Sequence, residues 1–515
     1  MNKKWSILVV FFLFSHFVSA QERSLFPCGT VAAKSLWLKE YQRGQIDFRD
    51  DEETMYVPLA IHIVGDDYGL GYYRYYQVME SVCRLNTDFA EANIVFYIEG
   101  DIDYIDSTIW YAHDSILQGA EMMFQNNREH ALNCYFLDDP AGNCGYNLPY
   151  GGIALAKSCL GEGSHTWAHE TGHALSLPHP FLGWEGGVSY DGSVGHSYSD
   201  PAPTEVYYDY TLFKDTLYLD TLIIDTALVE LVDGSNCAIA ADGFCDTSPD
   251  YLYHRWLCDE NAVSEIEQTD PAGVKFYSDA TLIMAYPLDS CQSRFSPGQI
   301  EAMRAYLLDV KTDWLDHETP LAQIAGTTEL LVPANNQEVQ YENVLLTWSG
   351  VPNATDYYLK LYKKIGSQGI TTVGKYTIHN DTSLLLTDLH KNKTYYWEVK
   401  PTNRYSYCAS FSVRDTFFTV EETVGINDFV DKGFSVFPTI VSAGKVMTVL
   451  TPEETGEEIN IRLIDIAGNT ILTTIKNRTG KNRRWTFPIP QVPEGMYIVA
   501  IGSGGQQVYK KIFVR

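Results

Sequence analysis

The sequence predicts a multidomain chain in which an α/β (α+β) domain is followed by two all-β sandwich domains. The length of 515 residues leads us to expect roughly two to four domains. Residues 53–316 alternate apolar, strand-like runs with helix-like segments, as chains that form α/β sheets do. Residues 320–421 and 424–515 instead contain short alternating strands separated by turn residues, which is the pattern of β-sandwiches.

Residues 1–20 are predicted to be a secretory signal peptide. Two lysines precede a short apolar run over residues 7–14, and a Val-Ser-Ala sequence ends the segment. The apolar run is too short for a membrane span, and no other segment is expected to cross a bilayer. Export makes the ten cysteines candidates for disulfides. The formal charge of −29 argues against nucleic acid or an anionic membrane as a partner.

Several segments of residues 53–316 outline a sheet with a helix against it. Residues 56–62 are predicted to be a buried first strand, and residues 93–99 and 132–137 further strands. Residues 76–89 have the apolar spacing of a helix. Residues 152–156 are predicted to be the edge strand, along which an extended chain could lie.

The motif His-Glu-x-x-His begins at His169 and is followed by a third histidine, His179. On a helix, His169 and His173 lie one turn apart and can meet one metal ion. Pro178 should end the helix, so that the chain turns back and delivers His179. Three imidazoles leave a fourth position open, which is typical of a catalytic zinc site. His165 could also be a ligand, but we favour a position at the helix start, with capping by a neighbouring hydroxyl.

Glu170 follows the first histidine and can reach a metal-activated water, which is the position of a general base. The whole motif resembles the signature of the metzincin metalloproteases, His-Glu-x-x-His-x-x-Gly-x-x-His. Ser176 stands where the family has glycine, and a serine with positive φ would cost about 1–2 kcal/mol there. The resemblance implies a zinc (Zn2+) protease domain over residues 53–316.

Cys28 lies in the sequence Phe-Pro-Cys-Gly-Thr near the start of the exported chain. It is either a disulfide cysteine or, as a thiolate, a zinc ligand that occupies the position of the water. A Cys-Gly motif is proposed to do the latter in the pro-segment of the pappalysin branch of the metzincins. The resemblance therefore implies a pro-segment over residues 21–52 with Cys28 as its latency ligand.

The sequence Ile-Met-Ala-Tyr at residues 283–286 resembles the Met-turn of the pappalysins. The resemblance implies that Met284 forms an apolar floor below the zinc and that Tyr286 donates its hydroxyl to the developing oxyanion. Without this context, both side chains would be assigned to the core. Ser296 and the proline after it predict the start of a C-terminal helix that ends at Leu308.

The resemblance implies further features around this turn. Four cysteines permit three pairings, and the family favours Cys258 with Cys291, followed by Cys237 with Cys245. Asp289 would line the pocket for the residue after the scissile bond and favour Arg or Lys there. A solvated loop carboxylate is an equal alternative for Asp289.

Residues 242–248 resemble the pappalysin segment Gly-Asp-x-x-x-Asp-Thr-Pro, although Ala241 and Ser248 replace its glycine and its proline. The acidic residues could bind calcium (Ca2+), and a plain capped turn is at least as good an interpretation. Residues 186–236 are predicted to be an insertion with a hairpin over residues 211–230.

The C-terminal domains show two more resemblances. Trp348 and the spacing from Leu389 to Tyr395 resemble a fibronectin type III domain over residues 320–421, which would be a spacer or binding module. Residues 424–515 resemble the C-terminal sorting domain of type IX secretion substrates, with Pro-Thr-Ile in place of the family's Pro-Asn-Pro. Such a domain is an address read by the secretion machinery, not a membrane anchor. It implies release from the cell or attachment to its surface.

These observations predict a secreted zinc endopeptidase that acts on proteins or peptides. One alternative is a catalytically weak surface binding or adhesion protein that keeps the zinc-protease scaffold, but an intact Glu170 speaks against it. The other alternative is a zinc hydrolase for a non-peptide bond. An edge strand that can pair with an extended chain favours peptide substrates.

Overall fold

The computed structural model describes the chain as two compact units. One unit holds the α/β domain and most of the first β-sandwich, and the other holds the rest of that sandwich and the C-terminal one. The predicted signal peptide lies outside the described residues. These are residues 25–30, 33–46, 53–149, 151–209, 224–315, 323–366, 369–421, 435–438, 440–451, 458–465, 469–477, 484–503 and 506–515.

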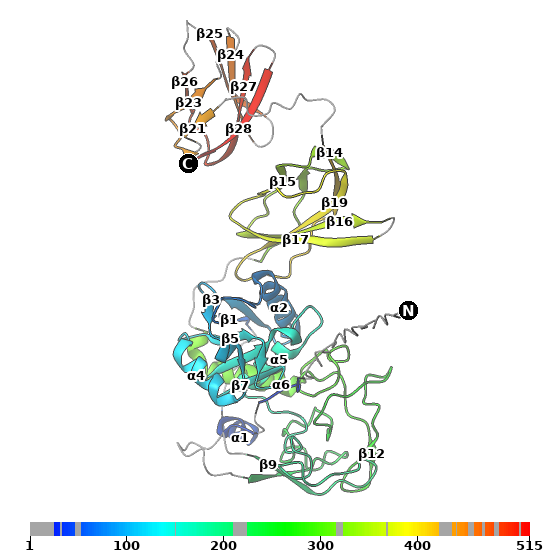
Figure 1. Ribbon diagram of the computed structural model, residues 1–515. Helices are drawn as coiled ribbons and strands as arrows, with labels where there is room; N and C mark the ends of the chain where they lie inside the picture. Colours follow the sequence, from blue (N-terminus) through cyan, green and yellow to red (C-terminus); the bar gives the residue numbers. More distant parts are fainter. Residues whose placement is uncertain are drawn as a thin grey trace, which may run out of the picture. The chain divides into compact units, whose positions relative to one another are not determined.

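The α/β domain is built on a six-stranded sheet (Figure 1). Its order is β2-β1-β5-β8-β7, and β3 also pairs with β1. Neighbouring strands are parallel except for β8 and β7, which are antiparallel. The strands are β1 (Met55–Gly65), β2 (Ile94–Ile98), β3 (Asp103–Asp106), β5 (Leu132–Leu137), β7 (Gly145–Leu148) and β8 (Gly152–Ala156).

Strand β7 forms one edge of this sheet. The prediction that residues 152–156 form the edge is wrong, because β8 pairs with β5 on one side and with β7 on the other. β7 precedes β8 in the chain and folds back outside it as an antiparallel neighbour. The outer side of β7 is therefore where an extended segment can pair with the sheet.

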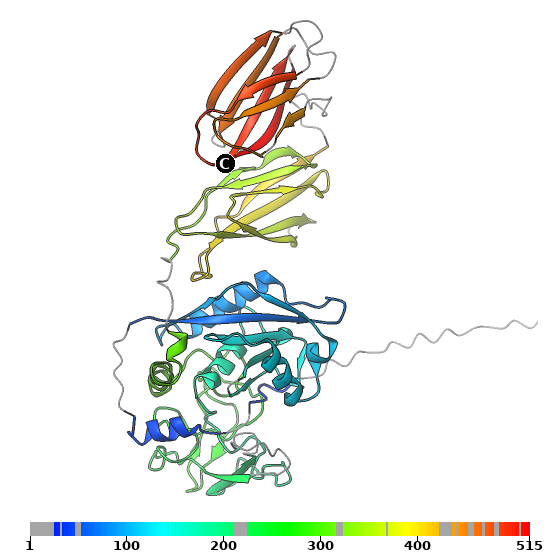
Figure 2. The same cartoon turned by 90° about the vertical axis from the view of Figure 1, so that its left-hand side faces the viewer.

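Helices cover both faces of the sheet (Figures 1 and 2). Alternate residues of β5 belong to two different cores, as the period of a strand requires. The core that contains Phe136 also receives side chains from α2 (Tyr75–Asp88), α5 (Thr166–Ala174) and α6 (Pro297–Asp309). The core that contains Tyr135 receives them from α4 (Ile116–Asn126). The helix predicted over residues 76–89 agrees with α2 to within one residue at each end.

The chain between α5 and α6 has little regular structure. β9 (Glu205–Asp209) and β10 (Ile224–Leu228) form an antiparallel hairpin, so the predicted hairpin starts earlier than expected, and residues 210–223 lie outside the described residues. The other short elements of the domain are α1 (Leu36–Gln42), α3 (Thr108–Tyr111), β4 (Ala112–His113), β6 (Asp139–Pro140), η1 (Lys157–Cys159), β11 (Gln268–Thr269), β12 (Lys275–Phe276) and η3 (Thr312–Trp314).

An aromatic core and disulfides stabilise this irregular region. Trp184, Tyr251 and Phe276 lie in a core cluster separate from those of the sheet. The two disulfides expected near the Met-turn, Cys237–Cys245 and Cys258–Cys291, are both present.

Two further disulfides, Cys144–Cys159 and Cys83–Cys408, lie outside this region and were not anticipated.

The first β-sandwich consists of a three-stranded and a five-stranded sheet. Trp348 is buried, and the centroid of its ring lies 6.4 Å from that of Trp397. Its position in the core agrees with the prediction. The strands are β13 (Leu330–Val332), β15 (Val344–Trp348) and β18 (Ser383–Leu386) in one sheet, and β14 (Gln337–Gln340), β20 (Asp415–Val420), β19 (Lys393–Thr402), β16 (Asp356–Ile365) and β17 (Gly369–His379) in the other.

The C-terminal sandwich repeats this arrangement strand for strand. Its core is formed by buried aliphatic and aromatic side chains such as Ile461 and Phe487. The strands are β21 (Ser435–Phe437), β23 (Val446–Leu450) and β26 (Arg484–Pro488) in one sheet, and β22 (Ile440–Val441), β28 (Gln506–Val514), β27 (Gly495–Ser503), β24 (Glu458–Asp465) and β25 (Thr470–Asn477) in the other.

Candidate metal centre

Helix α5 ends in a turn that places the third histidine opposite the first two. Ser176 has a φ of 77°, so the residue at the family's glycine position adopts the left-handed conformation. The N–H of Leu177 donates to the carbonyl of Gly172, and the N–H of Ser176 donates to the carbonyl of His173. This pair of bonds is the Schellman motif that ends many helices. The chain then runs back to His179.

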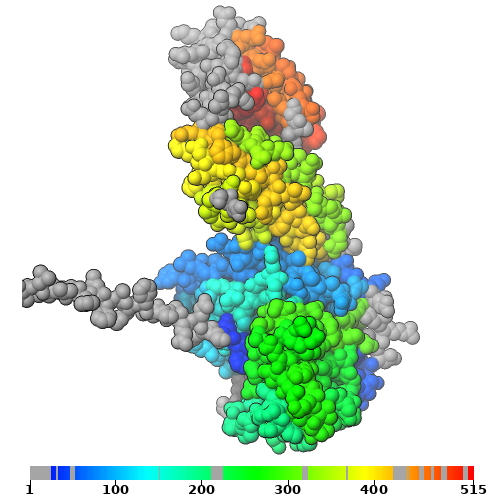
Figure 3. All heavy atoms as spheres, turned by 90° about the vertical axis from the view of Figure 1, so that its right-hand side faces the viewer, coloured from blue at the N-terminus to red at the C-terminus, as the bar shows by residue number. Residues whose placement is uncertain are grey.

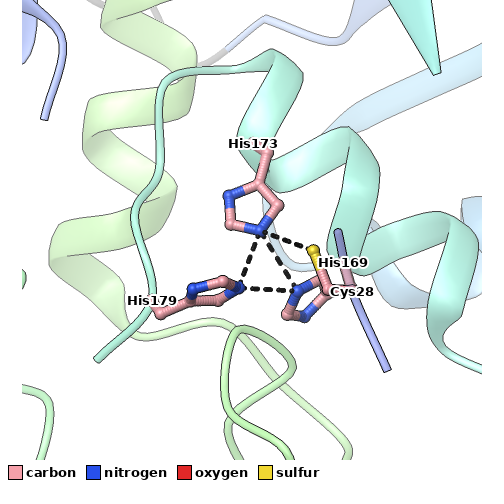
Figure 4. Close-up of side chains that lie close together, drawn as sticks. All are labelled: Cys28, His169, His173 and His179. Carbon is pink, nitrogen blue, oxygen red and sulfur yellow. Dashed lines mark hydrogen bonds between the residues drawn. The ribbon is translucent and has the colours of Figure 1, made fainter. Parts of the chain in front are cut away.

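Three imidazoles converge through their Nε2 atoms (Figure 4). The Nε2 atoms of His169, His173 and His179 are 3.0 to 3.2 Å from one another, and the Sγ of Cys28 lies 3.6 Å from Nε2 of His173. All four side chains are buried. The structure thus brings together the three predicted ligands and the predicted latency cysteine.

The spacing of these atoms fits a tetrahedral zinc ion. With ordinary Zn–N and Zn–S bond lengths, two nitrogen ligands would be about 3.3 Å apart, and a nitrogen and a thiolate about 3.6 Å apart. The observed separations lie close to both values. Cys28 forms no disulfide, so that alternative for it is wrong. His165 lies outside this cluster, because its Nδ1 pairs with Asp88 at 3.1 Å.

A hydrogen bond at Nδ1 orients each imidazole. Nδ1 of His169 lies 2.8 Å from the carbonyl of Ile283, and Nδ1 of His173 lies 2.7 Å from the carbonyl of Leu177. Because a carbonyl can only accept, Nδ1 must carry the proton, and the lone pair of Nε2 faces the centre. Burial lowers the pKa of all three histidines, that of His179 to about 3, so the rings stay neutral as metal ligands must.

Glu185 orients the third ligand, and the sequence did not point to it. Its Oε1 lies 3.1 Å from Nδ1 of His179, and its Oε2 accepts the N–H of Gly183 at 2.7 Å. It therefore completes a carboxylate–histidine pair of the kind that supports zinc ligands. Burial raises the pKa of Glu185 to about 8. A single acid in an aromatic loop carries no motif, so only the folded structure reveals this contact.

Glu170 lies beside the cluster and is fully buried. Its Oε2 accepts the hydroxyl of Thr30 at 2.8 Å, whereas its Oε1 is buried without a hydrogen-bond partner. Burial raises the pKa of Glu170 to about 8, which suits proton exchange near neutral pH. Gly145 of β7 leaves room for this side chain, because a Cβ there would lie 2.8 Å from Cγ of Glu170.

Met284 and Tyr286 both lie close to the candidate metal centre. Met284 is buried against α5, and a Cβ on Gly172 would lie only 2.4 Å from its sulfur. The hydroxyl of Tyr286 is 3.3 Å from Nε2 of His179. Burial raises the pKa of Tyr286, so the phenol keeps the proton that it would donate.

The segment around Cys28 follows the edge strand of the sheet. The carbonyl of Phe26 accepts the N–H of Cys144 at 2.6 Å, and the N–H of Gly29 donates to the carbonyl of Gly145 at 2.8 Å. The bridge between Phe26 and Asn143 is parallel. Figure 3 shows part of this N-terminal segment, in dark blue, between the cyan and green parts of the α/β domain. An extended segment of the chain itself therefore passes over the candidate metal centre.

The acidic residues proposed for calcium act in a turn and a helix cap. Asp242 accepts the N–H of Phe244 at 3.0 Å and the hydroxyl of Thr247 at 3.1 Å. Asp246 accepts the hydroxyl of Ser296 and the N–H of Gly298 at the start of α6. These contacts are those of the capped-turn alternative. A calcium ion at this position stays a prediction.

Comparisons with known proteins identify the C-terminal end of the chain. Residues 442–515 match the family described as a secretion system C-terminal sorting domain, which confirms the prediction for this segment. The protein is therefore secreted or held at the cell surface, and the type IX secretion machinery is a partner. No helix of the described ranges is long and apolar enough to cross a membrane.

The comparison with solved structures gives a weaker similarity. A crystal structure of the chicken CNTN1 FN1-FN3 domains is similar to part of the chain, with 13% sequence identity and a TM-score of 0.15. The match covers 36% of this chain and 66% of that one. The β-sandwich assignment rests on the strand order above and not on this similarity. No curated protein matches the sequence.

Replacing Glu185 by glutamine should weaken zinc binding. The amide is a poorer acceptor for Nδ1–H of His179, and loss of such a partner typically lowers metal affinity about 10–100-fold. Competition with a chromophoric chelator would measure the change on the full chain, with the exposed Glu205→Gln as the matched control. An unchanged affinity in Glu185→Gln would contradict the assigned role.

Ser176→Gly should affect stability differently with and without Ser35. Glycine removes a conformational cost of about 1–2 kcal/mol, but it also removes the 2.7 Å hydrogen bond between the two serine hydroxyls. That bond contributes about 0.5–1.5 kcal/mol. We expect Ser176→Gly to leave the free energy of unfolding nearly unchanged in the wild type. In a Ser35→Ala background, Ser176→Gly should raise the free energy of unfolding by about 1–2 kcal/mol. Urea unfolding would measure the change in the free energy of unfolding in both backgrounds. Equal effects of Ser176→Gly in the two backgrounds would show that the Ser35 hydroxyl does not compensate for the conformational cost.

Proposed function

We propose that this protein is a secreted zinc-dependent endopeptidase. The observation that carries the proposal is the convergence of three neutral imidazoles beside a buried carboxylate, at the edge strand where an extended segment already pairs. His169, His173 and His179 would hold the metal. When bound, zinc supplies a Lewis acid that lowers the pKa of a neighbouring water towards about 7.

Two side chains of the protein would carry the proton and charge steps. Glu170 would accept the proton of the attacking water and return it to the leaving amine. Its free Oε1 and its position beside the ligands support this role. The hydroxyl of Tyr286 would donate a hydrogen bond to the oxyanion that develops on the scissile carbonyl. Its protonated state in the buried site supports this second role.

The edge strand favours a peptide over another kind of substrate. The backbone of residues 26–29 already exchanges hydrogen bonds with residues 142–145 next to the metal centre. A substrate peptide could use the same backbone groups once this segment has left. A site built only for a non-peptide bond would have no need of these groups.

The same contacts support a latent precursor in which residues 21–52 act as a pro-segment. Cys28 would take the fourth metal position, and the Thr30 hydroxyl engages the oxygen of Glu170 at 2.8 Å. Both the position for water and one oxygen of the general base are then occupied. Removal of the segment would free both.

Cleavage of a mixed peptide library would test the proposed function directly. Limited trypsin cleavage after the exposed Arg43 would first be used to release the pro-segment of the full chain, and the trypsin would then be blocked by a serine-protease inhibitor. We expect Glu170→Ala to lower peptide cleavage by about 10²–10⁴-fold, because it removes the general base. Chelation of zinc should abolish cleavage, and the exposed Glu205→Ala should have no effect. Stoichiometric zinc binding without any cleavage would refute the peptidase and favour a binding protein.

Cys28→Ala should make the unprocessed full chain more active. Alanine cannot ligate zinc, so the segment loses its contact with the metal and should leave the edge strand more readily. Cleavage of a fluorogenic peptide by the uncut chain would measure the effect. Cys134→Ala, which changes the other free buried cysteine, is the matched control. Equal activity in Cys28→Ala and wild type would argue against the latency role.

A further inference from the structure

A small pocket opens beside the candidate metal centre, between the start of α5 and the loop that follows the Met-turn. Its wall includes His169, Tyr286 and Gln292. Two charged residues, Arg255 and Asp289, line the same pocket. Under the proposed function, this is the pocket that the resemblance assigns to the side chain after the scissile bond, because Asp289 lines it.

Asp289 does not face this pocket as a lone carboxylate. Its Oδ2 lies 3.7 Å from a guanidinium nitrogen of Arg255, and its Oδ1 accepts the N–H of His165 at 3.1 Å. Both residues line the pocket, and their side chains are about one-third exposed, at 31% for Arg255 and 33% for Asp289, so the pair is not sealed in the core. The two charges cancel within the pocket.

Arg255 is held in place independently of Asp289. Its Nη1 donates to the carbonyl of Pro287 at 2.8 Å, in the loop directly after the Met-turn. The guanidinium is always charged and forms directed hydrogen bonds, so a Lys or Arg side chain of a substrate would meet a fixed positive charge. An Arg or Lys preference would follow only if Asp289 lined the pocket without Arg255 beside it.

We propose that Arg255 is a specificity-determining residue, and that by pairing with Asp289 it makes this pocket select an uncharged side chain after the scissile bond. This inference rests on the proposed peptidase function. The chain's own N-terminal segment agrees with it, because the residue that lines the pocket from that segment is the uncharged Pro27.

The pair permits a charge-reversal test by two conservative variants. Arg255→Gln keeps a donor for the carbonyl of Pro287 and leaves Asp289 unpaired, so it should raise the relative cleavage of peptides with Lys or Arg after the scissile bond at least about tenfold. Asp289→Asn keeps an oxygen acceptor for the N–H of His165 and leaves Arg255 unpaired. Asp289→Asn should raise the relative cleavage of peptides with Asp or Glu after the scissile bond by a similar factor. The double variant, which carries neither charge, should again prefer an uncharged residue after the scissile bond.

The measurement is a comparison of kcat/KM on one peptide series that differs only at this position, with the trypsin-activated full chain after trypsin has been blocked. Circular dichroism and zinc content would show that each variant is folded and metallated. A wild-type preference for Lys or Arg, or an unchanged preference in Arg255→Gln, would overturn the inference while leaving the peptidase intact. Absence of cleavage by any folded, zinc-loaded variant would overturn the proposed function and this inference with it.

Discussion

The left-handed turn at Ser176 is the constraint on which the candidate site depends. A helix alone can bring His169 and His173 to one face, because they are one turn apart. The third imidazole reaches them only because the chain reverses at the end of α5 and runs back to His179. Serine tolerates this conformation at a cost, and its hydroxyl gains a partner in Ser35.

The two halves of the α/β domain meet through the second nitrogen of each ligand. The carbonyl of Ile283, in the Met-turn, accepts from Nδ1 of His169, and the side-chain amide of Gln292 donates to the same carbonyl at 3.1 Å. Met284 packs against the helix directly behind the ligands. The loop therefore determines both the tautomer and the position of a ring on α5, although more than a hundred residues separate them in sequence.

The edge strand gives the N-terminal segment its position. Backbone hydrogen bonds to residues 142–145, which lead into β7, align residues 26–29, and this alignment carries Cys28 to the imidazoles and Thr30 to Glu170. One short segment therefore meets the edge strand, the metal position and the carboxylate together. Under the proposed function, the N-terminal segment and a substrate bind the same surface. The segment therefore has to leave before a substrate can bind.

Local patterns in the sequence were sufficient for the features that depend on near neighbours. The spacing of His169 and His173, the cap of α6 at Ser296 and the boundaries of α2 follow from helix geometry within one or a few turns. The resemblance to known motifs anticipated the partners of Cys258 and Cys237, and the C-terminal sorting domain.

Only the tertiary structure decided the features that depend on which distant segments pair. The apolar run of β8 looked like an edge strand, but β7 folds outside it, and no local pattern shows the order of strands in a sheet. The contact of Glu185 with His179 and the pairing of Arg255 with Asp289 arise in loops without periodicity. Single charged residues in loops have no spacing to read, so their partners are determined by how the chain packs.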